Sequence, residues 1–299
     1  MHILVTGGTG FIGRSLCREL HNEGHGVTVY TRNPASLSRI FDFPVEGLAS
    51  LEEWPTHRHI DAVINLAGEP IMARRWSDAR KRVLWESRVS LTERLVERMA
   101  QAPVKPSVFI SGSAIGIYGD QGDTLLDESS VGGDDFGHQL CAAWESAALQ
   151  AEAQGIRVCL LRTGLVVGKQ GGFLDRMLMP FKLGLGGRIG DGRQWTSWIH
   201  LKDHVALTLF LLRTSQARGP YNATAPNPVT NQEFTRELAL QLHRPAFLPI
   251  PAWLLKVVAG EMSGLLLGSQ RALPRHAQAQ GFRFSFETLA PALQDALIG

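Results

Sequence analysis

The chain has 299 residues, of which 44% are hydrophobic and 19% are charged, and this balance excludes a disordered chain, a collagen and a coiled coil. Thirty basic and 28 acidic residues leave a net charge of only +2, so no whole-molecule field would attract nucleic acid or an acidic membrane. We therefore expect an α/β protein of enzyme size with no nucleic-acid or membrane partner.

The cysteine content favours a reducing compartment. Cys17, Cys141 and Cys159 have no spacing typical of a disulfide framework or of a zinc site. The N-terminus has no basic segment followed by a long apolar stretch, as a secretory leader would. We expect a cytoplasmic protein without a metal site.

Residues 1–168 show strands alternating with helices. An apolar run at residues 3–5 breaks at a glycine turn, and apolar residues resume at helical spacing from Phe11 to Leu20. Further short apolar runs predict buried strands at residues 27–30, 61–65, 107–111 and 158–162, with helices around residues 91–99 and 144–148. This alternation predicts an α/β fold, a Rossmann-like doubly wound parallel sheet.

Beyond residue 168 the pattern changes to a glycine-rich loop. We expect a smaller C-terminal substrate lobe over residues 169–299, with residues 205–225 packing back on the sheet as a helix and a short strand. Residues 252–267 are apolar enough for a pair of helices. Because Lys256 and Glu261 interrupt them, we expect this pair to be buried or to line the substrate site rather than to enter a membrane.

The glycine turn has the spacing Gly7-x-x-Gly10-x-x-Gly13, directly after a strand and at the start of a helix. In a dinucleotide site, such glycines permit the tight turn, the approach of a pyrophosphate and close packing of helix on strand. The free N–H groups at the helix start, from Phe11 and Ile12 onward, would receive the negative charge. The alternative is a tight turn with no ligand.

The end of the second strand indicates which dinucleotide is bound. An acidic residue there would select NAD(H), whereas this chain has Thr31 and Arg32. A guanidinium can bind a 2′-phosphate through paired hydrogen bonds, so NADP(H) is favoured. The alternative for Arg32 is a solvated loop arginine.

Several further motifs follow the strands in a fixed order: Asn65-Leu66-Ala67-Gly68, Ser111-Gly112-Ser113, Leu161-Arg162-Thr163-Gly164 and Trp198-Ile199-His200-Leu201-Lys202-Asp203. With them the chain resembles the extended, nucleotide-sugar-epimerase-like short-chain dehydrogenases/reductases. More narrowly it resembles an atypical "epimerase family protein" subfamily, sometimes labelled as cell-division-inhibitor related. The resemblance implies that Leu66, Ala67, Gly68, Arg88 and the main chain from Thr163 to Val166 complete the NADP(H) pocket.

The catalytic pair Tyr-x-x-x-Lys, common in this superfamily, is absent. Four residues after Tyr30, Tyr118 and Tyr221 stand Pro34, Gly122 and Ala225. The family spacing places Gly137 and Cys141 near the positions of the missing tyrosine and lysine.

Four residues are candidates to replace the missing acid. Ser113 could hold a substrate oxygen, or be a strand-end serine bonded to local backbone. Tyr118 could offer a phenol, or pack beneath the nucleotide. His138 could donate a proton, or face water at a helix start. Glu69 could act as a base, or cap the following helix. Cys141 is expected mainly to pack within a helix.

Residues beyond position 190 could contribute on the substrate side. Trp195 and Trp198, with Arg193, could form a wall against a sugar or against a planar substrate. His200 and Asp203 fall in the segment that the resemblance places near substrate, and their alternative is a hydrogen-bonded structural turn.

Two classes of function follow from these observations. The first is an NADP(H)-dependent oxidoreductase or epimerase acting on a small molecule, nucleotide-linked molecules included. The second is a catalytically silent NADP(H)-binding sensor or interaction protein, which the missing tyrosine and lysine favour. No pattern indicates the substrate or the oligomeric state.

Overall fold

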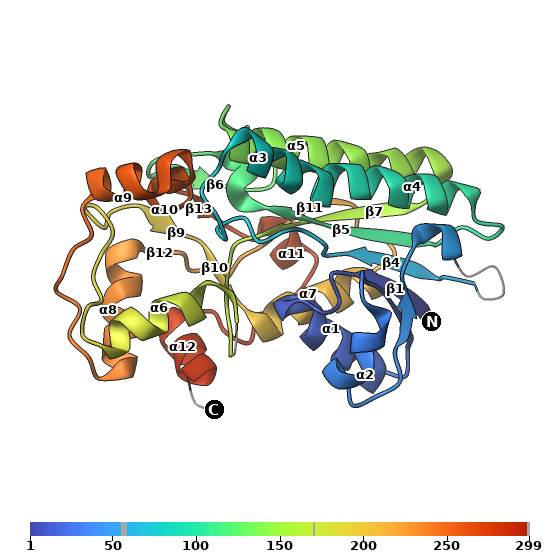
Figure 1. Ribbon diagram of the computed structural model, residues 1–299, viewed down its shortest axis with the longest axis horizontal. Coiled ribbons are helices and arrows are strands. Elements are labelled where there is room, and N and C mark those ends of the chain that lie inside the picture. Colours follow the sequence, from blue (N-terminus) through green and yellow to red (C-terminus); the bar gives the residue numbers. More distant parts are fainter. Residues whose placement is uncertain (55–58, 170, 298–299) are drawn as a thin grey trace.

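A seven-stranded parallel sheet lies at the centre of the molecule (Figure 1). The computed structural model describes residues 1–54, 59–169 and 171–297. In spatial order the strands are β11 (Gly219–Ala223), β7 (Arg157–Thr163), β5 (Val108–Ala114), β4 (Ala62–Asn65), β1 (His2–Thr6), β2 (Gly26–Tyr30) and β3 (Glu46–Leu48). The expected Rossmann-like doubly wound sheet is confirmed.

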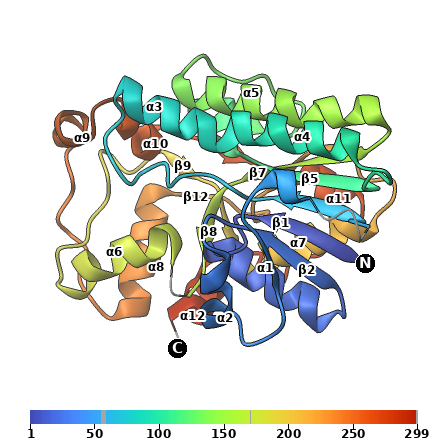
Figure 2. The same cartoon turned by 45° about the vertical axis from the view of Figure 1, so that its right-hand side comes forward.

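Helices cover both faces of this sheet because side chains alternate along each strand. Ile3 and Val5 pack into one hydrophobic core, whereas Leu4 packs into the core on the opposite face. The first core receives α1 (Phe11–Asn22), α2 (Leu37–Ile40), α7 (Leu201–Arg213) and α11 (Arg275–Ala279). The other face is covered by α3 (Asp78–Trp85), α4 (Leu91–Gln101) and α5 (Phe136–Leu149) (Figures 1 and 2).

A smaller lobe lies beside the carboxyl ends of β5 and β7 and has a core of its own around Trp198, Phe234 and Leu293. Its pairings are β8 (Leu165–Val167) with β10 (Trp198–His200), β9 (Trp195–Thr196) with β12 (Val229–Thr230), and β6 (Leu125–Leu126) with β13 (Arg271–Ala272). Its helices are α6 (Gly172–Lys182), α8 (Asn231–Leu242), α9 (Ala252–Ala259), α10 (Gly264–Leu267) and α12 (Leu289–Leu297).

Helix α6 corrects the expectation of a loop after residue 168. Glycines begin and end this segment, but Leu174 and Phe181, two helical turns apart, are both buried in the core of the lobe. Burial of this apolar side therefore outweighs the glycine-rich composition.

The helix pair expected within residues 252–267 is present as α9 and α10, but α9 is not buried. Trp253, Val257 and Val258 are each more than 60% exposed. Only Leu265 and Leu266, around α10, reach a cavity between the lobes. Among the described residues, no helix is long and apolar enough to cross a membrane.

The chain returns to the sheet through α7 and β11, which pairs with β7. Arg157, at the start of β7, secures this return: Nη1 donates to the carbonyls of Leu211 and Ala217 at 3.0 Å, and Nη2 to that of Leu212 at 3.1 Å. A buried guanidinium therefore satisfies carbonyls at the C-terminus of α7, where a cation is also favoured by the helix dipole. Whether the Rossmann unit ends at residue 168 stays a prediction, because Ala277 and Phe284 also pack into the core under the sheet.

We predict that Arg157→Met lowers the free energy of unfolding by about 2–4 kcal/mol, because the carbonyls of Leu211 and Leu212 lose the guanidinium donor and that of Ala217 keeps only the weak thiol donor of Cys159. Urea denaturation monitored by circular dichroism measures this loss. Arg218→Met, at an exposed position next to β11, is the matched control and should change stability by less than about 0.5 kcal/mol. Equal small losses in both variants would show that Arg157 does not secure the return of the chain.

Candidate functional site

The glycine turn between β1 and α1 requires glycine at two positions. Gly7 has φ +69°, and a Cβ there would lie 2.6 Å from the carbonyl carbon of Leu66. A Cβ on Gly13 would lie 2.2 Å from the carbonyl oxygen of Gly7. The turn is therefore as tight as the spacing of the glycines predicts.

The N-terminus of α1 is open to an anion. Gly10 is its N-cap and provides no side-chain hydrogen bond, and the first turn, which includes Phe11 and Ile12, contains no acidic residue. The loop at Leu66 and Ala67 lies against this turn, where the N–H of Ala67 donates to Thr6 Oγ1 at 3.2 Å. Unsatisfied N–H groups and the positive end of the helix dipole thus point at one place.

Arg32 lies after β2 with its side chain 92% exposed. Its Nη2 is 3.5 Å from Glu69 Oε1, and Arg80 Nη1 is 3.6 Å from Glu69 Oε2. Beside it, Thr31 Oγ1 accepts a hydrogen bond from the N–H of Asn33 at 3.4 Å. The structure thus brings Glu69 to Arg32 as an ion-pair partner, so the carboxylate lies between two guanidinium groups.

Arg88 is a half-buried cation next to the loop that contains Gly68. It lies in a π-helical turn, Glu86–Ser90, a feature frequent at functional sites. Its Nη2 donates to the carbonyl of Glu69 at 3.0 Å, and its guanidinium lies 5.4 Å from the ring centre of Trp144. A Cβ on Gly68 would lie only 2.8 Å from Arg88 Cζ, so glycine is needed for this approach. Burial lowers the pKa of Arg88.

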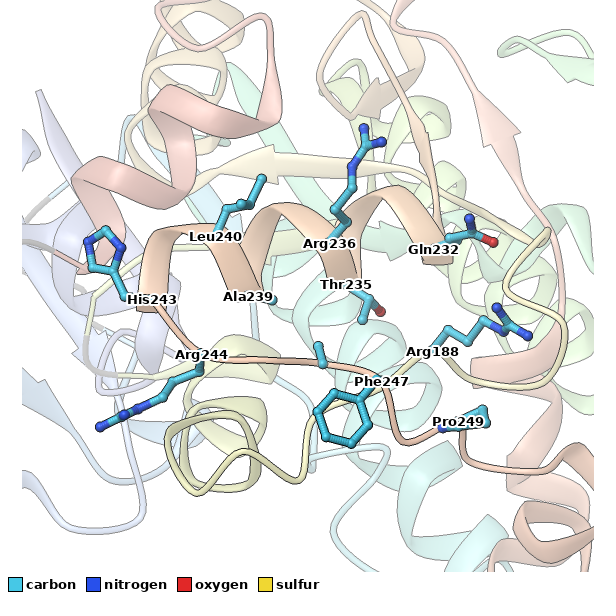
Figure 3. A pocket seen from close by; sticks show the side chains of 11 residues that line it. Arg188, Gln232, Thr235, Arg236, Ala239, Leu240, His243, Arg244, Phe247 and Pro249 are labelled. Atoms are coloured by element: carbon cyan, nitrogen blue, oxygen red, sulfur yellow. The ribbon is translucent and has the colours of Figure 1, made fainter.

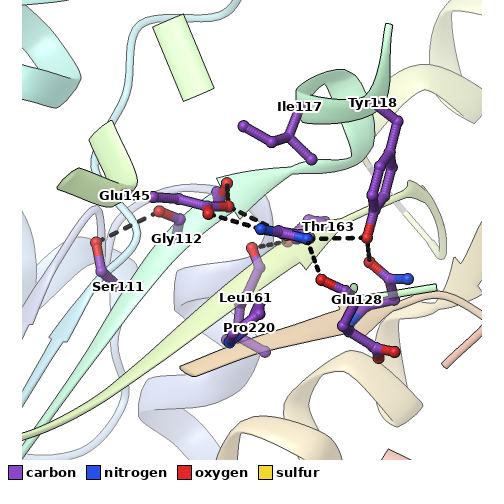
Figure 4. Close-up of polar contacts among 12 residues, drawn as sticks. Ser111, Gly112, Ile117, Tyr118, Glu128, Glu145, Leu161, Thr163 and Pro220 are labelled. Atoms are coloured by element: carbon purple, nitrogen blue, oxygen red, sulfur yellow. Dashed lines mark hydrogen bonds and ion pairs between the residues drawn. The ribbon is translucent and has the colours of Figure 1, made fainter. Parts of the chain in front are cut away.

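A buried ion pair joins β7 to α5 (Figure 4). Arg162 Nε and Nη2 donate to the two oxygens of Glu145 at 2.8 and 2.9 Å. Burial alone would lower the pKa of Arg162, but the hydrogen bonds and the charge of Glu145 outweigh it and raise that pKa above its usual range. No role for this pair was expected from the sequence, although a charged residue at the end of the apolar run 158–161 was a signal for it.

Two of the catalytic candidates belong to this buried network. Ser113 Oγ donates to Glu145 Oε1 at 2.6 Å. The Tyr118 hydroxyl has no exposure, donates to Asn222 Oδ1 at 2.7 Å and accepts from Arg162 Nη1 at 3.1 Å. Burial raises the pKa of Tyr118. Both hydroxyl protons are therefore engaged inside the protein, and the proton-donor roles of these two side chains stay predictions.

His138 and Cys141 lie on the first turns of α5. His138 Nδ1 is 2.5 Å from the carbonyl oxygen of Ile117, so the imidazole is half-buried against that turn instead of facing water. Burial raises the pKa of the Cys141 thiol to about 12. The thiol therefore stays protonated at neutral pH and is a poor nucleophile.

A cavity of about 270 Å³ lies between the sheet and the smaller lobe. Ala114 and Thr163, at the carboxyl ends of β5 and β7, form its floor together with Gly137 and Cys141 of α5. Ligands of open α/β sheets bind at this edge. Thr163 Oγ1 is also 3.0 Å from His204 Nε2, and Val166 follows within β8.

A second hollow, of about 580 Å³, lies along α8 in the smaller lobe (Figure 3). Arg188, Arg236, His243 and Arg244 line it together with Phe247. The hollow shares no lining residue with the cavity at the sheet.

The candidate substrate-side residues beyond position 190 lie in different surroundings in the structure. Trp195 lines the cavity between the lobes, whereas Trp198 is fully buried in the core of the lobe and cannot contact substrate. His200 caps α7, and Asp203 accepts from the N–H groups of residues 285 and 286, so both have structural partners. Within residues 1–54, 59–169 and 171–297, no cluster of three or more metal-ligating side chains occurs.

Comparison with known proteins identifies relatives along the whole chain. A family model described as the NAD dependent epimerase/dehydratase family matches residues 3–224, and a domain of unknown function (DUF1731) matches residues 250–296. The epimerase family protein SDR39U1 of Homo sapiens is 36% identical, over 99% of both chains. YfhF of Bacillus subtilis is 37% identical, over 99% of this chain and 98% of its own.

Solved structures show the same architecture. The crystal structure of human SDR39U1 (isoform 2) with NADPH has a TM-score of 0.88 at 34% identity and covers 99% of each chain. A UDP-galactose 4-epimerase, with a TM-score of 0.76 at 21% identity over 99% of this chain and 97% of its own, shares the fold. The chain therefore belongs to the NAD dependent epimerase/dehydratase family, among the SDR39U1-type epimerase family proteins, which are atypical extended short-chain dehydrogenases/reductases.

Proposed function

We propose that this protein is an NADP(H)-dependent oxidoreductase or epimerase that acts on a small molecule in the cavity between the lobes. The observation that carries the proposal is the open glycine turn at the start of α1, on the same edge of the sheet as the cavity at the ends of β5 and β7. A dinucleotide held at that turn would extend along this edge toward the cavity.

The residues present fit the pyrophosphate. Gly7, Gly10 and Gly13 leave no side chain over the turn, and the N–H groups from Phe11 and Ile12 onward supply donors. Leu66, Ala67 and Gly68 would flank the adenosine side. Arg88, for which the described residues provide no carboxylate ion pair, would neutralise phosphate charge beneath this loop.

Thr31 and Arg32 would select NADP(H) over NAD(H). The guanidinium of Arg32 is almost fully exposed and needs only to rotate away from Glu69 to reach a 2′-phosphate. Glu69 keeps Arg80 as a partner when Arg32 turns. The structure of human SDR39U1 with NADPH supports this choice.

The main chain from Thr163 to Val166 would hold the nicotinamide end of the cofactor beside the cavity. When bound there, the reduced dinucleotide supplies a hydride to the substrate. We propose that the four catalytic candidates act as positioning residues: Ser113 and Tyr118 through the network of Arg162, His138 by fixing the start of α5, and Glu69 by orienting Arg32.

The presence of the cavity favours this proposal over a silent NADP(H)-binding sensor. A protein that only reports the redox state of its cofactor needs no space beside the nicotinamide. Incubation of the protein with NADPH and fractionated metabolites, followed by absorbance at 340 nm and mass spectrometry, tests for turnover. If absorbance at 340 nm and the metabolite masses stay unchanged with every fraction, the protein is better described as a silent NADP(H)-binding sensor.

For the cofactor we predict that Arg32→Ala weakens NADPH binding by about 1–3 kcal/mol, because a charge-assisted bond to the 2′-phosphate is lost. NADH, which has no such phosphate, should bind the variant as it binds the wild type. Calorimetric titration of both dinucleotides measures the difference, with Arg39→Ala on the neighbouring α2 as a control that leaves both affinities unchanged. An equal loss for NADPH and NADH would refute the assignment.

For the buried network we predict that Glu145→Gln lowers the free energy of unfolding by about 3–5 kcal/mol, because the buried Arg162 loses its charge partner. Ser113→Ala should cost about 1–3 kcal/mol, since it removes one hydrogen bond to a charged group, and should leave NADPH affinity unchanged. Urea denaturation provides the first readout and calorimetry the second.

The control for the network is Glu97→Gln, at an exposed position of α4, which should change stability by less than about 0.5 kcal/mol. Once a substrate is known, kcat can be compared between Ser113→Ala and the wild type. If Ser113 contacted the reacting oxygen directly, the variant would lose roughly 30- to 1000-fold in kcat. A loss of that size with unchanged stability would contradict the positioning role.

A further inference from the structure

The cavity between the lobes is lined by apolar and aromatic side chains. Among its described lining residues none is charged. The apolar wall includes Met72, Phe173, Met177, Ile189, Trp195 and Phe234. Flat aromatic faces and aliphatic side chains together favour a planar apolar ligand.

The polar side chains of the wall are largely occupied by the protein itself. Ser197 Oγ donates to the carbonyl of Gln270 at 2.8 Å, and Gln270 Nε2 donates to the carbonyl of Gly119 at 3.0 Å. Asn231 Oδ1 accepts from the N–H of Ile189 at 2.8 Å. The cavity therefore offers few free groups to a hydroxyl-rich sugar.

Cations lie behind the wall of the cavity but do not line it. Arg176 Nη1 donates to the carbonyl of Met72 at 2.9 Å, and the guanidinium of Arg271 lies 4.0 Å from the ring centre of Trp195. On α8, Asn231 and Phe234 face the cavity, whereas Gln232 and Arg236 line the separate hollow of Figure 3. At 100° per residue these two sets lie on different sides of the helix. A diphosphate in the cavity would lie beside apolar walls with no cation among the described lining residues, which is unfavourable. The volume of about 270 Å³ also lies just below the range of about 300–1,000 Å³ that is typical of ligand pockets.

No side chain on the floor of the cavity can readily deliver a proton. Gly137 and Cys141 stand where the family has its tyrosine and lysine, and a buried thiol is a weak acid. Reduction of an isolated ketone leaves a strongly basic alkoxide, which needs a nearby acid. Reduction of a quinone leaves a phenolate, whose conjugate acid resembles tyrosine with a pKa near 10, so water suffices as the proton source.

From the uncharged aromatic lining, its small volume and the missing acid, we infer that the cavity binds an uncharged quinone, not a nucleotide-linked sugar. The inference rests on the proposed NADP(H)-dependent function and specifies its substrate class. The hydride forms an O–H bond at one carbonyl oxygen, the ring becomes aromatic, and the second oxygen takes one proton from water. NADPH is oxidised to NADP⁺ and the quinone is reduced to the hydroquinone by the same two electrons.

Tetramethylbenzoquinone (duroquinone) is a suitable probe, because it is a single uncharged ring whose methyl groups block addition of thiols. Without cofactor, it should quench the tryptophan fluorescence of the full chain saturably, and Trp195→Phe should reduce this quenching. With NADPH, absorbance at 340 nm should fall at a rate that saturates with duroquinone. UDP-glucose, the anionic comparison ligand, should cause no quenching, and with NADP⁺, which it could reduce, it should cause no rise in absorbance at 340 nm.

Two methionines of α6 provide a matched pair of variants. Met177 lines the cavity, whereas Met179, two residues later, is 65% exposed. Met177→Lys should weaken duroquinone binding and lower its kcat/KM at least tenfold, because it introduces a cation into an apolar wall. Met177→Leu and Met179→Lys should stay within twofold of wild type in both measurements.

The outcomes separate this inference from the proposed function. Calorimetric NADPH binding, together with oxidation of UDP-glucose by NADP⁺ but no turnover of duroquinone, would overturn the quinone inference and keep the oxidoreductase. NADPH binding without saturable quenching by duroquinone would also overturn the inference. Loss of quenching equally in Met177→Lys and Met179→Lys would place the quinone elsewhere. Absence of NADPH binding would refute the proposed function itself.

Discussion

The bidentate ion pair between Arg162 and Glu145 is the interaction on which the site depends. It joins the end of β7 to the middle of α5, and Arg162 also donates to Tyr118 and to the carbonyl of Glu128. The charges of Arg162 and Glu145 can be buried here only because nearly all of the N–H groups of the guanidinium and the oxygens of the carboxylate have hydrogen-bond partners. The pair therefore fixes the positions of the strand ends and of the first turns of α5, which together form the floor of the cavity.

This arrangement shows how a superfamily site is kept without the superfamily acid. Near the positions where the family spacing would place the tyrosine and lysine, Gly137 and Cys141 contribute no charged side chain to the floor of the cavity. The ionisable groups nearby are either turned into the protein, as Ser113 and Tyr118 are, or paired with each other, as Glu69 and Arg32 are. Under the proposed function, these surroundings would suit hydride transfer to an acceptor that does not need an enzymic acid.

The parallel sheet and the glycine turn could be predicted because their signals are local. Short apolar runs such as residues 3–5 and 158–161 must be buried on both faces, and glycine at Gly7 and Gly13 is required by backbone geometry within a few residues. Helix α6 was missed because its glycine-rich ends concealed the two buried residues that stabilise it. The exposed face of α9 was also misjudged, since no local signal shows whether another element will cover an apolar helix.

The sequence by itself determined the fold class, the place of the dinucleotide turn and the absence of Tyr-x-x-x-Lys, because each of these is a pattern within a short stretch of chain. Only the tertiary structure decided which groups Ser113, Tyr118 and Glu69 contact. Their hydrogen-bond and ion-pair partners, Glu145, Asn222 and Arg32, are 32, 104 and 37 positions away in sequence. The availability of a hydroxyl or a carboxylate depends on its neighbours in space, and long-range packing sets those neighbours.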